Sequence, residues 1–302
     1  MYPFKHISYP SEDAITGFSV LIPTWNNLQY LKLCIESILA HSSLKHQVIV
    51  AVNEGSDGSL DYVIENRIDH VHFEKNSGVC YAVNAARSLA RSSYLMYIND
   101  DMYVLPGWDR VLLEKILQLS TPLFMLSATM IEPRYTGNPC VIVKDFGTSP
   151  DTFQKELLIQ YASRTSKEDW QGSTWPPFVV HRNVWDLVGG FGIEFTPGFY
   201  SDPDFSMKLK VCGVQHFIGL GSALVYHFGT KSTKRVKKNA GKDLFLLKWG
   251  ITASDFYKNI LRLGSQDDAK NKGYRIFSSG ISKIKYKLKS IKAILTRKSS
   301  FK

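Results

Sequence analysis

The chain has 302 residues, of which 44% are hydrophobic, and it carries a formal net charge of +10. No window holds 18 consecutive apolar residues, which excludes a typical membrane-spanning helix. The four cysteines are far apart and lack the C-x-x-C spacing of a zinc site, so we expect reduced thiols and no structural zinc. Because the first residues also lack the pattern of a secretory signal peptide, we expect a cytoplasmic protein.

The positive charge is concentrated towards the C-terminal end. Residues 231–302 hold 20 Lys and Arg against 4 Asp, whereas residues 1–230 hold 17 Lys and Arg against 23 Asp and Glu. We therefore expect a catalytic or binding domain over residues 1–230 and a basic, mainly helical extension over residues 231–302. The acidic first part shows no nucleic-acid-binding motif, so nucleic acid is not an expected partner.

Strand and helix patterns alternate along the first hundred residues. Short apolar runs bounded by turn residues predict strands, and apolar residues spaced three and four apart predict helices. The expected strands cover 17–22, 47–52, 70–73 and 94–98, and the expected helices cover 27–40, 60–66 and 78–89. This alternation predicts an α/β fold with a mostly parallel central sheet flanked by helices.

Asn99, Asp100 and Asp101 directly follow the last of these strands. In an open α/β sheet, ligands bind at the carboxyl ends of the strands. Two adjacent carboxylates repel each other unless a cation lies beside them, and Mg²⁺ usually binds through one or two carboxylates plus substrate phosphates. No glycine-rich phosphate loop follows the first strand, which argues against a dinucleotide dehydrogenase and a P-loop enzyme. We therefore expect a nucleotide to be held through a metal at the acidic pair.

Three further polar clusters accompany the acidic pair. They are residues 23–27 after the first strand, residues 53–57 after the second, and Ser201-Asp202-Pro203-Asp204 about a hundred residues beyond the acidic pair. In this order and spacing the motifs resemble glycosyltransferase family 2, a large group with the GT-A fold. The resemblance implies a metal-dependent, inverting transfer of a sugar from a nucleotide-diphosphate donor to a hydroxyl of a glycan or lipid-linked glycan. The implied cofactor is Mn²⁺ or Mg²⁺.

The resemblance also implies which residues bind the donor. The turns after the first two strands would contact the nucleotide, and the helix that begins near Gly78 would lie close to the diphosphate. Asn53 stands where the family usually has an acidic residue, which leaves the identity of the base open. The expected donor-side residues are Pro23, Thr24, Trp25, Asn26, Asn53, Glu54, Asn76, Gly78, Asn84 and Asp100.

The same resemblance implies catalytic and metal-binding roles. Asp202 matches the general base of the family, and Asp101 and His227 would bind the metal. Ser201 stands where the family usually has Glu. This departure keeps a non-catalytic glycan- or membrane-binding protein as one alternative. A sugar-nucleotidyltransferase is a second alternative, although the glycine-rich basic loop that it needs is missing.

Several candidates also have a purely structural alternative. Trp175, on the acceptor side, can stack on a sugar ring or pack in the core. Asp202 and Asp204 precede an apolar helical run, so either can cap that helix instead of binding an acceptor or its proton. A structural role is equally open for His227, and we expect Asp57 to cap a helix.

Residues 277–295 carry apolar side chains at steps of three and four, with lysines between them. This pattern predicts a basic amphipathic helix. Such a helix can bind the anionic inner face of a membrane, which would make the protein peripheral. Docking on its own domain and dimerisation are the alternatives.

Overall fold

The computed structural model describes residues 3–10, 14–229, 239–266 and 286–294. Its centre is an 11-stranded sheet with the order β1-β4-β3-β2-β5-β10-β7-β11-β6, while β8 pairs with β7 and β9 pairs with β11. The strands are β1 (Phe4–Ile7), β2 (Ser19–Trp25), β3 (Gln47–Asn53), β4 (Asp69–Phe73), β5 (Tyr94–Tyr97), β6 (Met102–Val104), β7 (Phe124–Glu132), β8 (Ile142–Val143), β9 (Trp170–Gln171), β10 (Phe178–His181) and β11 (His216–His227).

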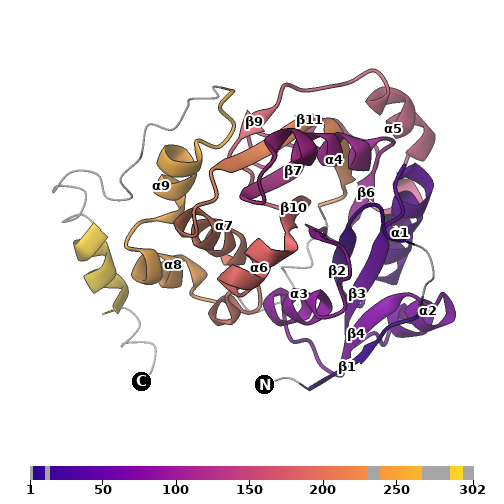
Figure 1. The fold of residues 1–302 in the computed structure, drawn as a ribbon, viewed down its shortest axis with the longest axis horizontal. Helices are drawn as coiled ribbons and strands as arrows, with labels where there is room; N and C mark the ends of the chain where they lie inside the picture. The colour runs from indigo at the N-terminus through magenta and orange to yellow at the C-terminus, as the bar shows by residue number, and fades with distance from the viewer. Residues whose placement is uncertain (1–2, 11–13, 230–238, 267–285, 295–302) are drawn as a thin grey trace.

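Helices cover both faces of this sheet (Figure 1). The α-helices are α1 (Leu28–His41), α2 (Ser59–Glu65), α3 (Val79–Arg87), α4 (Trp108–Leu119), α5 (Lys155–Ala162), α6 (Arg182–Val188), α7 (Ser201–Val211), α8 (Gly241–Trp249) and α9 (Ala253–Asp255). The shorter 3₁₀ segments are η1 (Pro150–Thr152) and η2 (Ile193–Phe195), and η4 (Phe256–Leu261) is a π-helix.

The sheet is mixed. Strands β4, β3, β2 and β5 pair in parallel, as the alternation of strands and helices predicts. Beyond β5, however, β10 is antiparallel to both β5 and β7, and β6 is antiparallel to β11. The prediction of an α/β sheet with flanking helices is confirmed. The second part of the sheet mixes these antiparallel pairs with the parallel pairs β7–β11 and β7–β8. The hydrophobic pattern predicts that a segment is a strand without specifying its neighbours.

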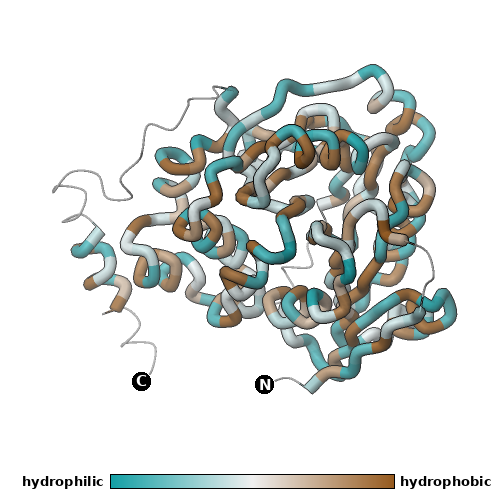
Figure 2. The backbone as a smooth tube through the Cα atoms, in the orientation of Figure 1, coloured by the Kyte–Doolittle hydropathy of each residue, from teal (hydrophilic) through white to brown (hydrophobic). Residues whose placement is uncertain are grey.

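Alternate residues of the central strands face opposite layers of helices. In β2, Val20 and Ile22 belong to the core that includes α1 and α4, whereas Leu21 belongs to the core that includes α3, α6 and α7. Figure 2 shows hydrophobic and hydrophilic residues alternating along the helices. This alternation is expected for helices that bury one side.

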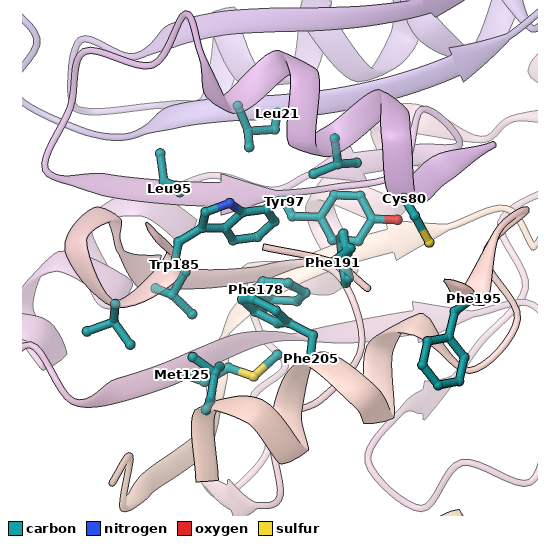
Figure 3. Close-up of a cluster of buried hydrophobic side chains, with 14 of the residues drawn as sticks. Leu21, Cys80, Leu95, Tyr97, Met125, Phe178, Trp185, Phe191, Phe195 and Phe205 are labelled. Carbon is teal, nitrogen blue, oxygen red and sulfur yellow. The ribbon is translucent and has the colours of Figure 1, made fainter. Parts of the chain in front are cut away.

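An aromatic cluster fixes the position of α7 against the sheet (Figure 3). Phe205 of α7 stacks on Phe178 of β10 with 5.5 Å between ring centroids, and its ring lies 5.1 Å from that of Phe191. Tyr97 of β5 contacts Phe178 and Phe191 at 5.3 Å and 5.4 Å. Full burial of one such side chain contributes about 1.5–3 kcal/mol to folding. The cluster therefore holds the first turn of α7 close to the end of β5.

Residues 241–265 pack onto the same core. Phe245 of α8 and Phe256 of η4 are fully buried in the cluster that includes α7. Two hydrogen bonds join this segment to β9: the Gln171 N–H donates to the Ser265 carbonyl (2.8 Å), and the Gly264 N–H donates to the Gln171 carbonyl (2.9 Å). The predicted domain boundary near residue 230 stays a prediction.

Residues 286–294 form a further helix. Its Ala293 is buried, whereas Leu288 is 63% exposed and Ile291 is 46% exposed. The other residues of the predicted amphipathic segment, 277–285 and 295, lie outside the described residues. Within the described parts of the chain, no helix is both long enough and apolar enough to cross a bilayer.

Candidate active site

A cleft of about 450 Å³ lies at the carboxyl ends of β2, β3 and β5, beside the start of α7. Ten of the residues that the sequence singles out line it: Pro23, Thr24, Trp25, Asn53, Asn76, Gly78, Asp100, Asp101, Asp202 and His227. Three carboxylates thus face this space, and none of its described lining residues is Lys or Arg. We refer to it as the acidic cleft. It brings Asp101 and Asp202 together across a hundred residues of sequence.

The ends of β2 and β3 form one wall of the acidic cleft. The parallel register places Trp25 opposite Asn53, so the turns that follow the two strands meet. The Asn26 side chain joins these turns, because its amide donates to Glu54 Oε2 (3.0 Å) and its Oδ1 accepts from the two backbone N–H groups that follow Glu54 (3.0 Å each). Neither Asn26 nor Glu54 is among the lining residues of the cleft. Their side chains hold together the turns that shape the wall.

Asn53 and Asp57 also use their side chains within the protein. Asn53 Oδ1 accepts from the backbone N–H (2.9 Å) and the hydroxyl (2.8 Å) of Ser77. Asp57 accepts from the N–H of Leu28 at the start of α1 (2.7 Å) and from that of Ser59 at the start of α2 (3.0 Å), although the N-cap residue of α2 itself is Gly58. Asn53 therefore positions the segment before α3 and at the same time lines the cleft.

Helix α3 begins against the loop that precedes α7. Gly78 has a φ of 77°, and a Cβ atom there would lie 2.8 Å from Pro197 Cα, so the approach requires glycine. Asn76 Oδ1 accepts from the Gly78 N–H (2.9 Å) and fixes this turn. Asn84 lies farther along α3 and forms two 2.8 Å hydrogen bonds with the backbone of Phe191. Asn84 is not among the lining residues, and it anchors the loop before η2.

Asp101, His227 and Glu132 form a row of polar side chains at the acidic cleft. The pairing of β6 with β11 sets His227 opposite Met102, which brings His227 Nε2 within 3.5 Å of Asp101 Oδ2. On the other side of the ring, Nδ1 lies 2.8 Å from Glu132 Oε1. The second oxygen of Glu132 accepts from the Thr136 hydroxyl (2.7 Å). Glu132 was missed by the sequence reasoning, because it lies 95 residues from His227 and at the end of a different strand.

Asp101 and His227 could hold a divalent ion only if the ion displaces the proton of the imidazole, because a protonated imidazole has no lone pair for a metal. Burial alone lowers the pKa of His227, but Asp101 and Glu132 outweigh this effect and raise the pKa to about 10. Among the described residues, no group of three His, Cys, Asp or Glu side chains is placed to hold a metal ion by itself. Asp101 and His227 offer two ligands, and substrate phosphates can supply others. Glu132 would orient the imidazole as an outer-shell partner.

Asp202 lies in the first turn of α7 and lines the acidic cleft. Burial raises its pKa to about 7, which is suited to a general base at neutral pH. Ser201, in the position where the family usually has Glu, is buried and donates to the Gly198 carbonyl (2.6 Å). Tyr200, just before the helix, has a φ of 70°. Nothing in the sequence marked Tyr200 as part of the site.

A second cleft, of about 680 Å³, adjoins the acidic cleft and shares Phe199, Tyr200 and Asp202 with it. We refer to it as the aromatic cleft, because Trp175 and Tyr257 also line it. The rings of Trp175 and Tyr257 lie 5.1 Å apart. Trp175 and Asp202 thus line the same cleft, whereas Tyr257 belongs to a segment in which the sequence showed no site.

Asp204 lines neither cleft. Its side chain is 0% exposed, accepts from Trp249 Nε1 (2.8 Å) and pairs with Lys248 Nζ (2.8 Å). Lys248 also pairs with Glu194 (2.7 Å). Asp204 therefore joins α7 to α8.

Comparison with known families agrees with this geometry. Residues 19–135 match the family model described as Glycosyl transferase family 2. The matched segment runs from β2 to β7 and includes the turns after β2 and β3 and the acidic pair. Over these residues the chain is similar to glycosyl transferase family 2.

The curated proteins that this chain resembles include bacterial glycosyltransferases. The putative teichuronic acid biosynthesis glycosyltransferase TuaG of Bacillus subtilis is 30% identical over 105 residues, which cover 33% of this chain and 40% of the relative. The putative colanic acid biosynthesis glycosyl transferase WcaA of Escherichia coli is 30% identical over 112 residues, which cover 35% and 40%. The glycosyltransferase GlyG of Streptococcus pneumoniae is 25% identical over 158 residues, which cover 51% of each chain. The chain thus spans about half or less of these relatives.

Solved structures confirm the predicted GT-A fold. S. aureus TarS 1–349 in complex with UDP-GlcNAc matches with a TM-score of 0.54 and 13% identity, over 78% of this chain and 67% of that one. GalNAc-T7 with UDP, GalNAc and Mn²⁺ matches with a TM-score of 0.55 and 14% identity, over 83% and 53%.

Proposed function

We propose that the protein is a metal-dependent, inverting glycosyltransferase that moves a sugar from a nucleotide-diphosphate donor to a hydroxyl of a glycan or lipid-linked glycan. The observation that carries this proposal is that Asp202 lines both clefts. A donor in the acidic cleft and an acceptor in the aromatic cleft would meet at this carboxylate.

The charge of the acidic cleft supports a metal-dependent donor site. A diphosphate would be repelled by Asp100 and Asp101, and no Lys or Arg from the described residues lines this cleft to offset that repulsion. Asp101 and His227 would hold the divalent ion. When bound, the ion supplies positive charge that stabilises the leaving diphosphate. Three of the similar structures were solved with UDP or UDP-GlcNAc, and one of these three also with Mn²⁺, so UDP-sugars with Mn²⁺ are the first ligands to test.

Asp202 would act as the general base. Its carboxylate would take the proton of the acceptor hydroxyl while that oxygen attacks the anomeric carbon. The nucleotide diphosphate would leave towards the acidic cleft, on the other side of that carbon. Attack from one side and departure from the other would invert the configuration.

The relatives support a role in polysaccharide synthesis, since two of them are named for teichuronic acid and colanic acid biosynthesis. We also propose that residues 286–294 contact an anionic membrane surface. Lys287 and Lys289 are exposed there together with Leu288 and Ile291. Co-sedimentation with anionic vesicles tests this contact, and equal binding by the double variant Lys287→Glu/Lys289→Glu would contradict it.

Thermal-shift measurements with UDP, GDP, dTDP and CDP sugars, each with and without Mn²⁺, test the donor site. A ligand of the folded state raises its stability by mass action. We expect one nucleotide class to stabilise the protein only when the metal is present. In transfer assays with that donor, Asp202→Asn should abolish turnover and keep the thermal shift, while Asp61→Asn, an exposed position in α2, serves as the matched control. A variant Asp202→Asn with full turnover would remove Asp202 from the mechanism.

A further inference from the structure

The two clefts that meet at Asp202 differ in charge. The acidic cleft is lined by three aspartates and one histidine, and its described lining residues include no Lys or Arg. The aromatic cleft is lined by Lys258 and Arg262, and Asp202 is the single acidic residue among its described lining residues. A neutral acceptor would need no such excess of positive charge. The excess of positive charge in the aromatic cleft therefore indicates the chemical class of the acceptor.

The basic side of the aromatic cleft is built on a well-anchored segment. Lys258 lies within the π-helix η4, and Arg262 is the C-cap residue that follows it, with a φ of 56°. Phe256 and Leu261 of the same segment are buried in the core. Gly172 lies so close that a Cβ atom there would come within 2.7 Å of Leu263 Cα. Together with the hydrogen bonds to β9, these contacts fix the backbone that carries both basic residues.

The same cleft offers groups suited to a sugar. Trp175 and Tyr257 present aromatic rings next to Lys258, and aromatic rings pack against the apolar faces of sugars. Ser265 also lines the cleft, and its buried hydroxyl oxygen has no hydrogen-bond partner among the described residues. A buried polar atom without a partner is uncommon in a folded protein, and a bound ligand can satisfy it.

We propose that the acceptor is an anionic glycan, with a phosphate or carboxylate group that binds Lys258 and Arg262 while its hydroxyl lies at Asp202. This inference rests on the proposed glycosyltransferase function and specifies its acceptor class. Lys and Arg bind both kinds of anion through charge-assisted hydrogen bonds. They also offset the repulsion between an anionic acceptor and the carboxylate of Asp202.

Binding measurements on the full chain with matched probes test this inference. The probes are methyl β-glucuronide for a carboxylate, glucose 1-phosphate for a phosphate and methyl β-glucoside as the neutral sugar. We expect at least one anionic probe to bind at least about tenfold more tightly than the neutral one, a difference that one charge-assisted contact can supply. This preference should shrink between about 50 mM and about 500 mM NaCl, because salt screens charges in an open cleft.

Substitutions assign the effect to the two basic residues. Lys258→Gln and Arg262→Gln should each weaken binding of the preferred anionic probe by about fivefold or more. Binding should be unchanged in Lys242→Gln, an exposed lysine of α8 outside both clefts. The conservative variants Lys258→Arg and Arg262→Lys should retain most of the binding, which separates loss of charge from loss of the fold.

The outcomes separate this inference from the proposed function. Equal binding of neutral and anionic probes, no binding of either anionic probe, or equal affinity in Lys258→Gln, Arg262→Gln and Lys242→Gln would each overturn the anionic acceptor. The metal-dependent thermal shift by a nucleotide would persist in those cases. Absence of that shift in the unmodified protein would instead refute the proposed function.

Discussion

Replacement of Glu132 by Gln would test whether the row of side chains from Glu132 to Asp101 is a metal site. The substitution keeps the shape of the side chain and removes its charge. The amide oxygen can still accept from His227 Nδ1, and the amide nitrogen can donate to the Thr136 hydroxyl in place of the present bond from Thr136. The variant therefore preserves the hydrogen-bond geometry at 2.8 Å and 2.7 Å and changes only the electrostatics.

The magnitude follows from the difference between charged and neutral hydrogen bonds. A hydrogen bond to a charged group contributes about 1.5–3 kcal/mol, and a neutral one contributes about 0.5–1.5 kcal/mol. The loss of about 1–1.5 kcal/mol corresponds to about tenfold in metal affinity. Loss of an outer-shell partner of a metal ligand has a similar or larger effect, about 10–100-fold. We therefore expect Glu132→Gln to weaken Mn²⁺ binding by about tenfold or more.

The assay is a titration of Mn²⁺ at saturating nucleotide, with the thermal shift as the readout. In Glu132→Gln the Mn²⁺ concentration at half-maximal shift should rise by about tenfold. Glu65→Gln, at an exposed position at the end of α2, should leave it unchanged. A folded Glu132→Gln variant with an unaltered Mn²⁺ midpoint would refute the assignment of His227 as a metal ligand oriented by Glu132.

Four further predictions concern α7. Because burial raises the pKa of Asp202 to about 7 and the base acts when deprotonated, kcat/KM should increase with pH up to that value, and a pH-independent rate from pH 5 to 9 would contradict the assignment. Because the pKa of Asp202 is higher in the folded protein, its contribution to the free energy of unfolding should fall as the pH rises from its ordinary pKa of 3.8 to about 7 and should stay constant above that. Denaturant titrations at several pH values would measure this change. Asp204→Asn should destabilise the protein by up to about 3–5 kcal/mol, because it leaves Lys248 paired only with Glu194, and urea unfolding at neutral pH would measure the loss. Phe205→Ala should cost about 3–5 kcal/mol of stability, and turnover per folded molecule should also fall because α7 carries Asp202; equal turnover would contradict the positioning role of the aromatic cluster.

The strand pattern predicted that the turns after the first two strands lie at one edge of the sheet, but it did not predict how their side chains are hydrogen-bonded. Trp25 and Asn53 end neighbouring strands, and the strand pattern alone implies that such ends share one edge of the sheet. The side chains of Asn26 and Asn84, by contrast, bond to other parts of the chain. A motif specifies which residue type occupies a position. The direction in which an asparagine side chain points depends instead on the backbone torsions and on contacts from distant segments of the chain.

The parts of the site that the sequence did not predict depend on long-range pairing. Glu132 meets His227 only because β7 and β11 pair in parallel, and no local pattern specifies that pairing. Likewise, Lys258 and Arg262 lie in a region that net charge alone marked as a basic extension. Their place in a cleft beside Asp202 results from the burial of η4 against the core.

The opposite charges of the two clefts also indicate how the substrates would be sorted. An anionic acceptor that entered the acidic cleft would meet Asp100 and Asp101, and the repulsion between like charges would disfavour that mode of binding. A nucleotide diphosphate would be repelled there too until a divalent ion is bound, so the metal would select the donor for this cleft. Lys258 and Arg262 would attract the acceptor to the neighbouring cleft without a metal. Because Asp202 lines both spaces, charge would place each substrate on its own side of the base.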